Sequence, residues 1–177
     1  GADPTVLIGG IARNFGDDGA SYRMGCGRAF VIEGDEYDSA YFDKTAKFLK
    51  YLPDIAVVSN IEFDHADIYA NLDEVRLAFK RLVNLVPRRG LTLLGADSAD
   101  AAALEPLARS RVQTFGTSPA AHWRATDIEA REATAFTVVE GAKDHGRFEM
   151  GLLGDHNVRN ALAAIAAIED LAFGVAD

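Results

Sequence analysis

Residues 71–94 read NLDEVRLAFKRLVNLVPRRGLTLL, and this stretch decides the fold. Its first part, residues 71–86, carries apolar residues at helical spacing, with Asn71 in the N-cap position. One face holds Leu72, Val75, Ala78, Phe79, Leu82, Val83 and Val86. Pro87 ends the helix because proline has no backbone N–H and clashes with the preceding turn. Gly90 then leads into an apolar run, so the stretch predicts a helix followed by a buried strand at 91–94.

The same alternation continues on both sides of this stretch. Residues 55–60 (IAVVSN) are apolar and β-branched, as a buried strand requires. Residues 97–110 are alanine-rich and predict a helix, and residues 111–115 (RVQTF) predict a further strand. Strands and helices that alternate with short links favour a mostly parallel sheet flanked by helices. The sequence therefore predicts an α/β fold.

Towards the N-terminus, two strands are predicted at 5–8 and 28–33, with a polar, glycine-rich connection between them. Gly9 and Gly10 are expected to stop the first of these strands. The segment DKTAKFLKYL at 43–52 has apolar residues close to helical spacing and predicts a helix that ends before Pro53.

Towards the C-terminus, the pattern of the sequence changes. Residues 122–153 alternate between apolar and polar side chains, which predicts an antiparallel hairpin or meander. Residues 157–173 predict a long alanine-rich helix. No repeat and no linker interrupts the chain, so residues 1–177 are expected to form a single domain with a small antiparallel β appendage.

Composition excludes several classes of function. The formal net charge of -9 opposes nucleic acid or anionic lipid as the main partner, because both would be repelled. The single cysteine, Cys26, allows no intrachain disulfide. The sequence holds neither an apolar run of about 20 residues, which a membrane helix needs, nor a secretory signal, so a cytoplasmic protein is expected.

Two acidic clusters follow predicted strands. Residues 33–38 (EGDEYD) come after the strand at 28–33, and residues 60–67 (NIEFDHAD) come after the strand at 55–60. Ligands of open α/β sheets bind beyond the carboxyl ends of the strands. If these two strands are parallel neighbours, both clusters open into one crevice, and Glu33 and His65 could bind a metal there. Carboxylates suit Mg²⁺, whereas histidine is a softer ligand, and acidic surface loops are the alternative interpretation.

A third cluster, GDHNVRN at 154–160, opens the last predicted helix. Asn157 and Asn160 are three residues apart and share a helix face, so their amides could read the edge of an adenine base. Capping of the helix by Asp155 or Asn157 is the simpler alternative. No GxxxxGK[ST] phosphate loop occurs in the chain, and its lysines stand in no such context.

In this order, FVIEGDEYDSAYFDKTAKF (30–48), NIEFDHADIY (60–69) and GDHNVRNALAA (154–164) resemble the Mur ligase family, which joins amino acids or peptides to UDP-muramoyl precursors. The second and third elements are similar to the family's N-x-x-x-D-H-x-D-x-Y and G-x-H-N-x-x-N-A-x-A patterns. The first resembles the recycling branch, which attaches L-Ala-γ-D-Glu-meso-diaminopimelate to UDP-N-acetylmuramate. The L-alanine-adding branch looks less similar around Tyr41 to Phe48.

The resemblance implies a fold, cofactors and residue roles. The fold would be the family's central ATP-binding domain without its first strand, phosphate loop and helix. The cofactors would be ATP and Mg²⁺ or Mn²⁺, with Glu33 and His65 holding the metal. Asn60 and Asp64 would shape the metal-binding loop. Asn160, with Asn157 beside it, would contact adenine, and His156 aligns with a family histidine near the nucleotide.

Two departures from the family pattern limit these expectations. The phosphate loop and the family's UDP-binding and C-terminal domains are not in this chain, so the chain alone is expected to be inactive. The position of a carbamoylated lysine used by some members falls at Phe79, with Lys80 next to it, and no such role is assigned. A non-catalytic binding module and a folate-type polyglutamate ligase are the further alternatives, although the latter does not share the E-G-D-E-Y-D pattern.

Overall fold

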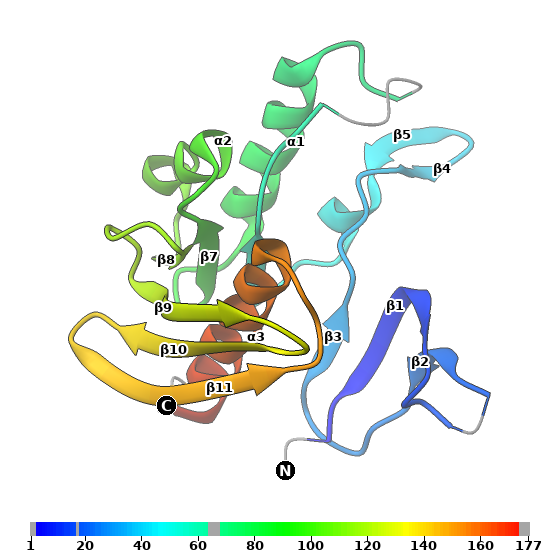
Figure 1. Cartoon of the computed structure of the whole chain (residues 1–177). Coiled ribbons are helices and arrows are strands. Elements are labelled where there is room, and N and C mark those ends of the chain that lie inside the picture. Colours follow the sequence, from blue (N-terminus) through cyan, green and yellow to red (C-terminus); the bar gives the residue numbers. More distant parts are fainter. Residues whose placement is uncertain (1–2, 17, 64–67, 174–177) are drawn as a thin grey trace.

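A six-stranded sheet forms the centre of the molecule in the computed structural model, which describes residues 3–16, 18–63 and 68–173 (Figure 1). Its strand order is β11-β10-β9-β8-β7-β6. Strands β6 to β9 run parallel to one another, and the pairs β9–β10 and β10–β11 are antiparallel. The bounds are β6 (Ile55–Val58), β7 (Leu91–Gly95), β8 (Arg111–Gly116), β9 (Trp123–Ala130), β10 (Thr134–Glu140) and β11 (Lys143–Met150).

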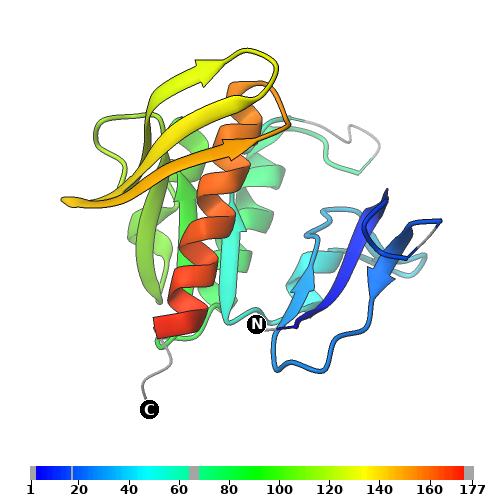
Figure 2. The same cartoon turned by 60° about the horizontal axis from the view of Figure 1, so that its bottom comes forward.

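Helices cover both faces of this sheet (Figure 2). On one face lie α1 (Leu72–Leu85), the short α2 (Ala99–Ala102) and the 3-10 helix η2 (Glu105–Leu107); on the other lies α3 (Asp155–Phe173). Alternating side chains of β7 serve both layers: Leu94 packs with α1, whereas Leu91 and Leu93 pack with α3. Within the described part of the chain, no helix combines the length and apolar character that a membrane span requires.

The N-terminal residues build a separate three-stranded sheet beside this body (Figure 1). Strand β1 (Thr5–Ala12) pairs antiparallel with β2 (Ala20–Arg23) and parallel with β3 (Phe30–Ile32). A hairpin of β4 (Asp38–Ala40) and β5 (Asp43–Ala46) follows, and then the 3-10 helix η1 (Lys47–Lys50). Phe48 of η1 packs in the same apolar cluster as α1, so η1 anchors this segment to the main sheet.

The structure confirms the α/β fold, the central helix and the antiparallel appendage. Helix α1 starts at the predicted N-cap, where the Asn71 Oδ1 accepts a hydrogen bond of 3.1 Å from the Glu74 amide. Strands β9 to β11 make the predicted meander.

Several predicted boundaries are wrong for local reasons. The helix expected at 43–52 is strand β5 followed by η1, because β5 pairs with β4 and the Asp43 carboxylate bonds the Thr45 amide and hydroxyl. The helix expected at 97–110 ends early, since Pro106 stands at the start of η2 and interrupts helical bonding. Gly9 and Gly10 do not stop β1, and β2 was not predicted.

Candidate functional site

A cavity of about 380 Å³ lies where β1, β3 and η1 meet. The cavity is lined by the middle of β1, the end of β3 with the acidic loop after it, and two residues from the segment of η1. The lining residues are Leu7, Ile8, Gly9, Ile32, Glu33, Gly34, Asp35, Glu36, Tyr37, Lys47 and Tyr51. The first predicted acidic cluster therefore lines a cavity. This position, beyond the carboxyl end of a strand, is where open sheets bind ligands.

Glu33 is held at the rim of this cavity by β1. Its amide donates to the Leu7 carbonyl at 3.0 Å, which extends the parallel β1–β3 pairing by one step. Its side-chain Oε2 accepts a hydrogen bond of 2.6 Å from the Gly9 amide. Short bonds of this kind are typical of an ionised acceptor. The carboxylate thus has one oxygen anchored to the backbone, an arrangement suited to presenting a charged group to a cation.

The strands that lead to the two acidic clusters are not neighbours, so the condition under which both clusters would open into one crevice is not met. Strand β3 pairs with β1, and β6 pairs with β7, in two different sheets. Strand β3 is an edge strand of the N-terminal sheet, and β6 is an edge strand of the main sheet. Asn60 follows β6 and is exposed.

Tyr69 nevertheless connects the two acidic segments. Its hydroxyl donates a 2.9 Å hydrogen bond to the Glu36 carbonyl, and only 9% of the residue is exposed. Burial, and then the negative charge of Glu36, raise the pKa of the Tyr69 hydroxyl, so the group stays a donor. His65 and Asp64 lie outside the described residues, so their predicted roles stay predictions.

Lys47 brings a positive charge to the cavity, which the sequence did not reveal because residue 47 fell in the expected helix at 43–52. The Nζ lies 3.0 Å from Asp35 Oδ2 and 6.0 Å from the centre of the Tyr37 ring. The hydrogen bond to Asp35 raises the pKa of the Lys47 ammonium, which therefore stays charged. This ammonium lowers the net negative charge of a lining that also holds Glu33, Asp35 and Glu36.

The residues expected to contact a nucleotide lie at the start of α3. The Asn157 Nδ2 donates to the Leu153 carbonyl at 2.9 Å, and the Asn157 amide to Gly154 at 3.0 Å, so Asn157 helps to form the turn. Gly154 has a φ of 101°, and a Cβ there would lie 2.9 Å from the His156 ring. Asn160 is exposed one turn further along.

Of the two predicted metal ligands, Glu33 lies in the described part of the chain and His65 does not. Among the residues that the structure describes, no group of three or more His, Cys, Asp or Glu side chains is arranged to hold a metal ion. Glu33 is a hard oxygen donor at a cavity rim and fits Mg²⁺. Glu33 is one of the two predicted ligands, and His65 is the other.

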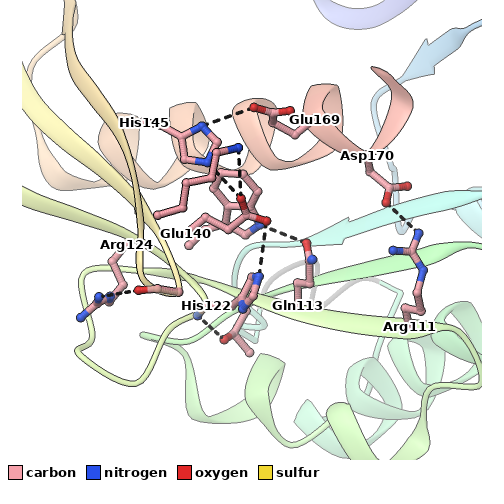
Figure 3. Close-up of polar contacts among 12 residues, drawn as sticks. Arg111, Gln113, His122, Arg124, Glu140, His145, Glu169 and Asp170 are labelled. Carbon is pink, nitrogen blue, oxygen red and sulfur yellow. Dashed lines mark hydrogen bonds and ion pairs between the residues drawn. The ribbon is translucent and has the colours of Figure 1, made fainter. Parts of the chain in front are cut away.

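A second polar cluster joins α3 to the sheet (Figure 3). The His145 ring lies between two carboxylates, with Nε2 at 3.0 Å from Glu140 and Nδ1 at 3.3 Å from Glu169. Next to it, Arg111 of β8 lies 2.7 Å from Asp170. These contacts come from β8, β10, β11 and α3. The cluster therefore holds the C-terminal end of α3 against the sheet and has a structural role.

Comparison with known proteins identifies the family. The family described as "Mur ligase middle domain" matches residues 24–168. The chain is 38% identical, over 97% of its length, to a UDP-N-acetylmuramate--L-alanine ligase of Geotalea uraniireducens, of which it covers 35%. It is also 38% identical, over 97% of its length, to a UDP-N-acetylmuramate--L-alanyl-gamma-D-glutamyl-meso-2,6-diaminoheptandioate ligase of Haemophilus influenzae, of which it covers 37%.

A solved structure agrees with these matches. The UDP-N-acetylmuramate:L-alanyl-gamma-D-glutamyl-meso-diaminopimelate ligase from Neisseria meningitides superposes with a TM-score of 0.83 at 37% identity, over 97% of this chain and 54% of that one. The chain spans about a third of the length of the curated relatives it matches. The family match and the shared fold together show that this chain belongs to the Mur ligase family, in its middle domain.

Proposed function

We propose that this chain is the ATP-handling part of a longer ligase that attaches L-Ala-γ-D-Glu-meso-diaminopimelate to UDP-N-acetylmuramate. The observation that carries the proposal is the Glu33 carboxylate, anchored at a cavity rim within the motif EGDEYD. A Haemophilus relative and a Neisseria structure carry the name of this activity. The phosphate loop, a UDP-binding domain and a C-terminal domain would come from the remainder of the longer protein, and the place of action would be the bacterial cytoplasm.

The reaction would form the amide through an acyl phosphate. A carboxylate oxygen of UDP-N-acetylmuramate attacks the γ-phosphorus of ATP, and ADP leaves. The amine of the peptide then attacks the acyl carbon, the C–O bond to phosphate breaks, and the nitrogen loses a proton. Negative charge gathers on the phosphoryl oxygens, so positioning and charge stabilisation dominate such catalysis.

The residues of this chain would bind and orient the reactants. Glu33 and His65 would hold Mg²⁺ or Mn²⁺, which supplies positive charge beside the phosphates. Asn60 and Asp64 would shape the loop around His65. Asn160, with Asn157 beside it, would contact adenine, and His156 would lie near the nucleotide.

Ligation by the full-length ligase tests the proposal. The enzyme is given Mg·ATP and UDP-N-acetylmuramate with either the tripeptide or free L-alanine, and ADP and product are measured. Preference for the tripeptide, with loss of ligation in Glu33→Gln, is the expected result. Absence of ligation with either amine would contradict the proposal and support a non-catalytic module.

Ligation of L-alanine is the second candidate function. It is favoured by the Geotalea relative, which carries that name at the same identity of 38% as the tripeptide ligase. Preference for L-alanine in the same assay would keep the metal site and the acyl phosphate and change the amine substrate.

A further inference from the structure

We propose that the backbone amide of Gly9 is a positioning group for Glu33, and that position 9 is a glycine because a side chain there would crowd this carboxylate. The inference rests on the proposed function, because it takes Glu33 as the metal ligand. It adds β1 to the site, although neither the motifs nor the charge pattern pointed to that strand.

The pairing of β1 with β3 explains the bond. In the parallel register Leu7 faces Ile32, and the Glu33 amide donates to the Leu7 carbonyl. In a regular parallel ladder the Gly9 amide would next donate to the Glu33 carbonyl. It donates instead to the Glu33 side chain at 2.6 Å. The carboxylate therefore accepts the hydrogen bond that the Glu33 carbonyl would accept in a regular ladder. The strand pairing itself orients the Glu33 side chain.

The absence of a side chain at position 9 belongs to this arrangement. A Cβ on Gly9 would lie 3.3 Å from the Glu33 Oε2, closer than most contacts of a Cβ, so the carboxylate would have to shift by a few tenths of an ångström. A Cβ on the neighbouring Gly10 would meet nothing within 4 Å. The two adjacent glycines thus differ in whether an added Cβ would crowd Glu33, which makes Gly10 a matched control.

The bond pre-organises the carboxylate. A free glutamate side chain loses rotamer freedom when it binds a cation, and a side chain already fixed through one oxygen loses less. The Gly9 amide occupies Oε2, so Oε1 is the oxygen that can turn to a cation. Metal affinity should accordingly depend on residue 9, while folding should not.

The first test uses this chain without metal. Hydrogen exchange of the Gly9 and Gly10 amides is followed by NMR in the unmodified chain and in Glu33→Ala. Because a hydrogen bond to a charged acceptor is strong, loss of the acceptor should speed exchange at Gly9 by about tenfold and leave Gly10 unchanged. Equal exchange at Gly9 in both proteins would overturn the proposal.

The second test uses the full-length ligase and compares Gly9→Ala, Gly9→Pro and Gly10→Ala. Direct Mn²⁺ titration by electron paramagnetic resonance and the Mg²⁺ concentration at half-maximal ligation are measured, with thermal midpoints as the check of folding. Gly9→Ala should weaken both metal readouts by about fivefold, and Gly9→Pro, which lacks the amide, by more. Gly10→Ala should match the unmodified enzyme.

The outcomes separate the two proposals. If Glu33→Gln keeps normal Mn²⁺ affinity, Glu33 is not the ligand, and the proposed function fails at this residue. If Glu33→Gln loses Mn²⁺ while Gly9→Ala behaves like Gly10→Ala, the function stands and the role of Gly9 is wrong.

Discussion

Tyr69 shows at the scale of single residues how a motif contributes to the site. It closes the pattern N-x-x-x-D-H-x-D-x-Y, and its hydroxyl bonds the Glu36 backbone carbonyl in the other acidic loop. The two clusters would open into one crevice if their strands were parallel neighbours, and they are not. The observed link is the phenol of Tyr69, two residues beyond the second cluster.

Replacing Tyr69 by Phe removes this hydrogen bond and should lower the free energy of unfolding by about 1 kcal/mol. The raised pKa of Tyr69 adds a pH dependence. The folded state favours the neutral phenol, so the stabilisation is complete below the ordinary tyrosine range of about pH 10 and is lost as pH rises through the folded value. Denaturant unfolding of both proteins from pH 8 to 11 checks this. A stability difference that stays constant over the whole range would contradict it.

The residues of the candidate site differ in how far their place in it could be predicted from the sequence. Glu33 was predictable because carboxylates after a strand have a recognisable place in the fold. Lys47 and Gly9 were not, since Lys47 fell in a segment with helical spacing and Gly9 acts through its backbone, which leaves no chemical pattern in the sequence. The role of His65 stays a prediction, because residue 65 lies outside the described residues.

At the scale of elements, helices α1 and α3 were predicted well, whereas the helices expected at 43–52 and 97–110 were not. Helix α1 has many apolar residues on one face and a capping residue, and both signals agree. The segment at 43–52 has apolar residues at a similar spacing, but strand pairing and the contacts of Asp43 decide its structure. The Lys50 ammonium, and then Thr45, lower the pKa of Asp43 to about 2. Such tertiary contacts override local propensity in short segments.

The N-cap of α1 provides a prediction at this scale. Asn71→Ala removes the acceptor for the Glu74 amide and should destabilise the chain by about 1 kcal/mol, as measured by denaturant unfolding. Asn84→Ala in the same helix is the control, because alanine favours a helix interior and the Asn84 side chain bonds only the Lys80 carbonyl among the described contacts. Equal stability of the two variants would contradict the role of Asn71.

At the scale of the whole molecule, the polar cluster around His145 links α3 to the antiparallel strands (Figure 3). The His145 side chain is 9% exposed and packs against Trp123, with ring centres 5.1 Å apart. His145→Ala leaves Glu140 and Glu169 facing a gap and should lower stability by about 1–3 kcal/mol. Lys143→Ala should change little, because its ammonium lies 3.9 Å from Glu140 at an exposed site. Thermal unfolding of both variants distinguishes these expectations.

The same scale decides whether this chain can act by itself. Its 177 residues contain no GxxxxGK[ST] motif, so they lack the loop of amides and the lysine that cradle the phosphates of ATP. In the proposed function Glu33 would hold a cation beside those phosphates, which a carboxylate by itself would repel. The purified chain with Mg·ATP, UDP-N-acetylmuramate and tripeptide should therefore release no ADP above the buffer rate, whereas the full-length ligase should release it steadily. Steady ADP release by the chain that disappears in Glu33→Gln would show that another part of the molecule cradles the phosphates.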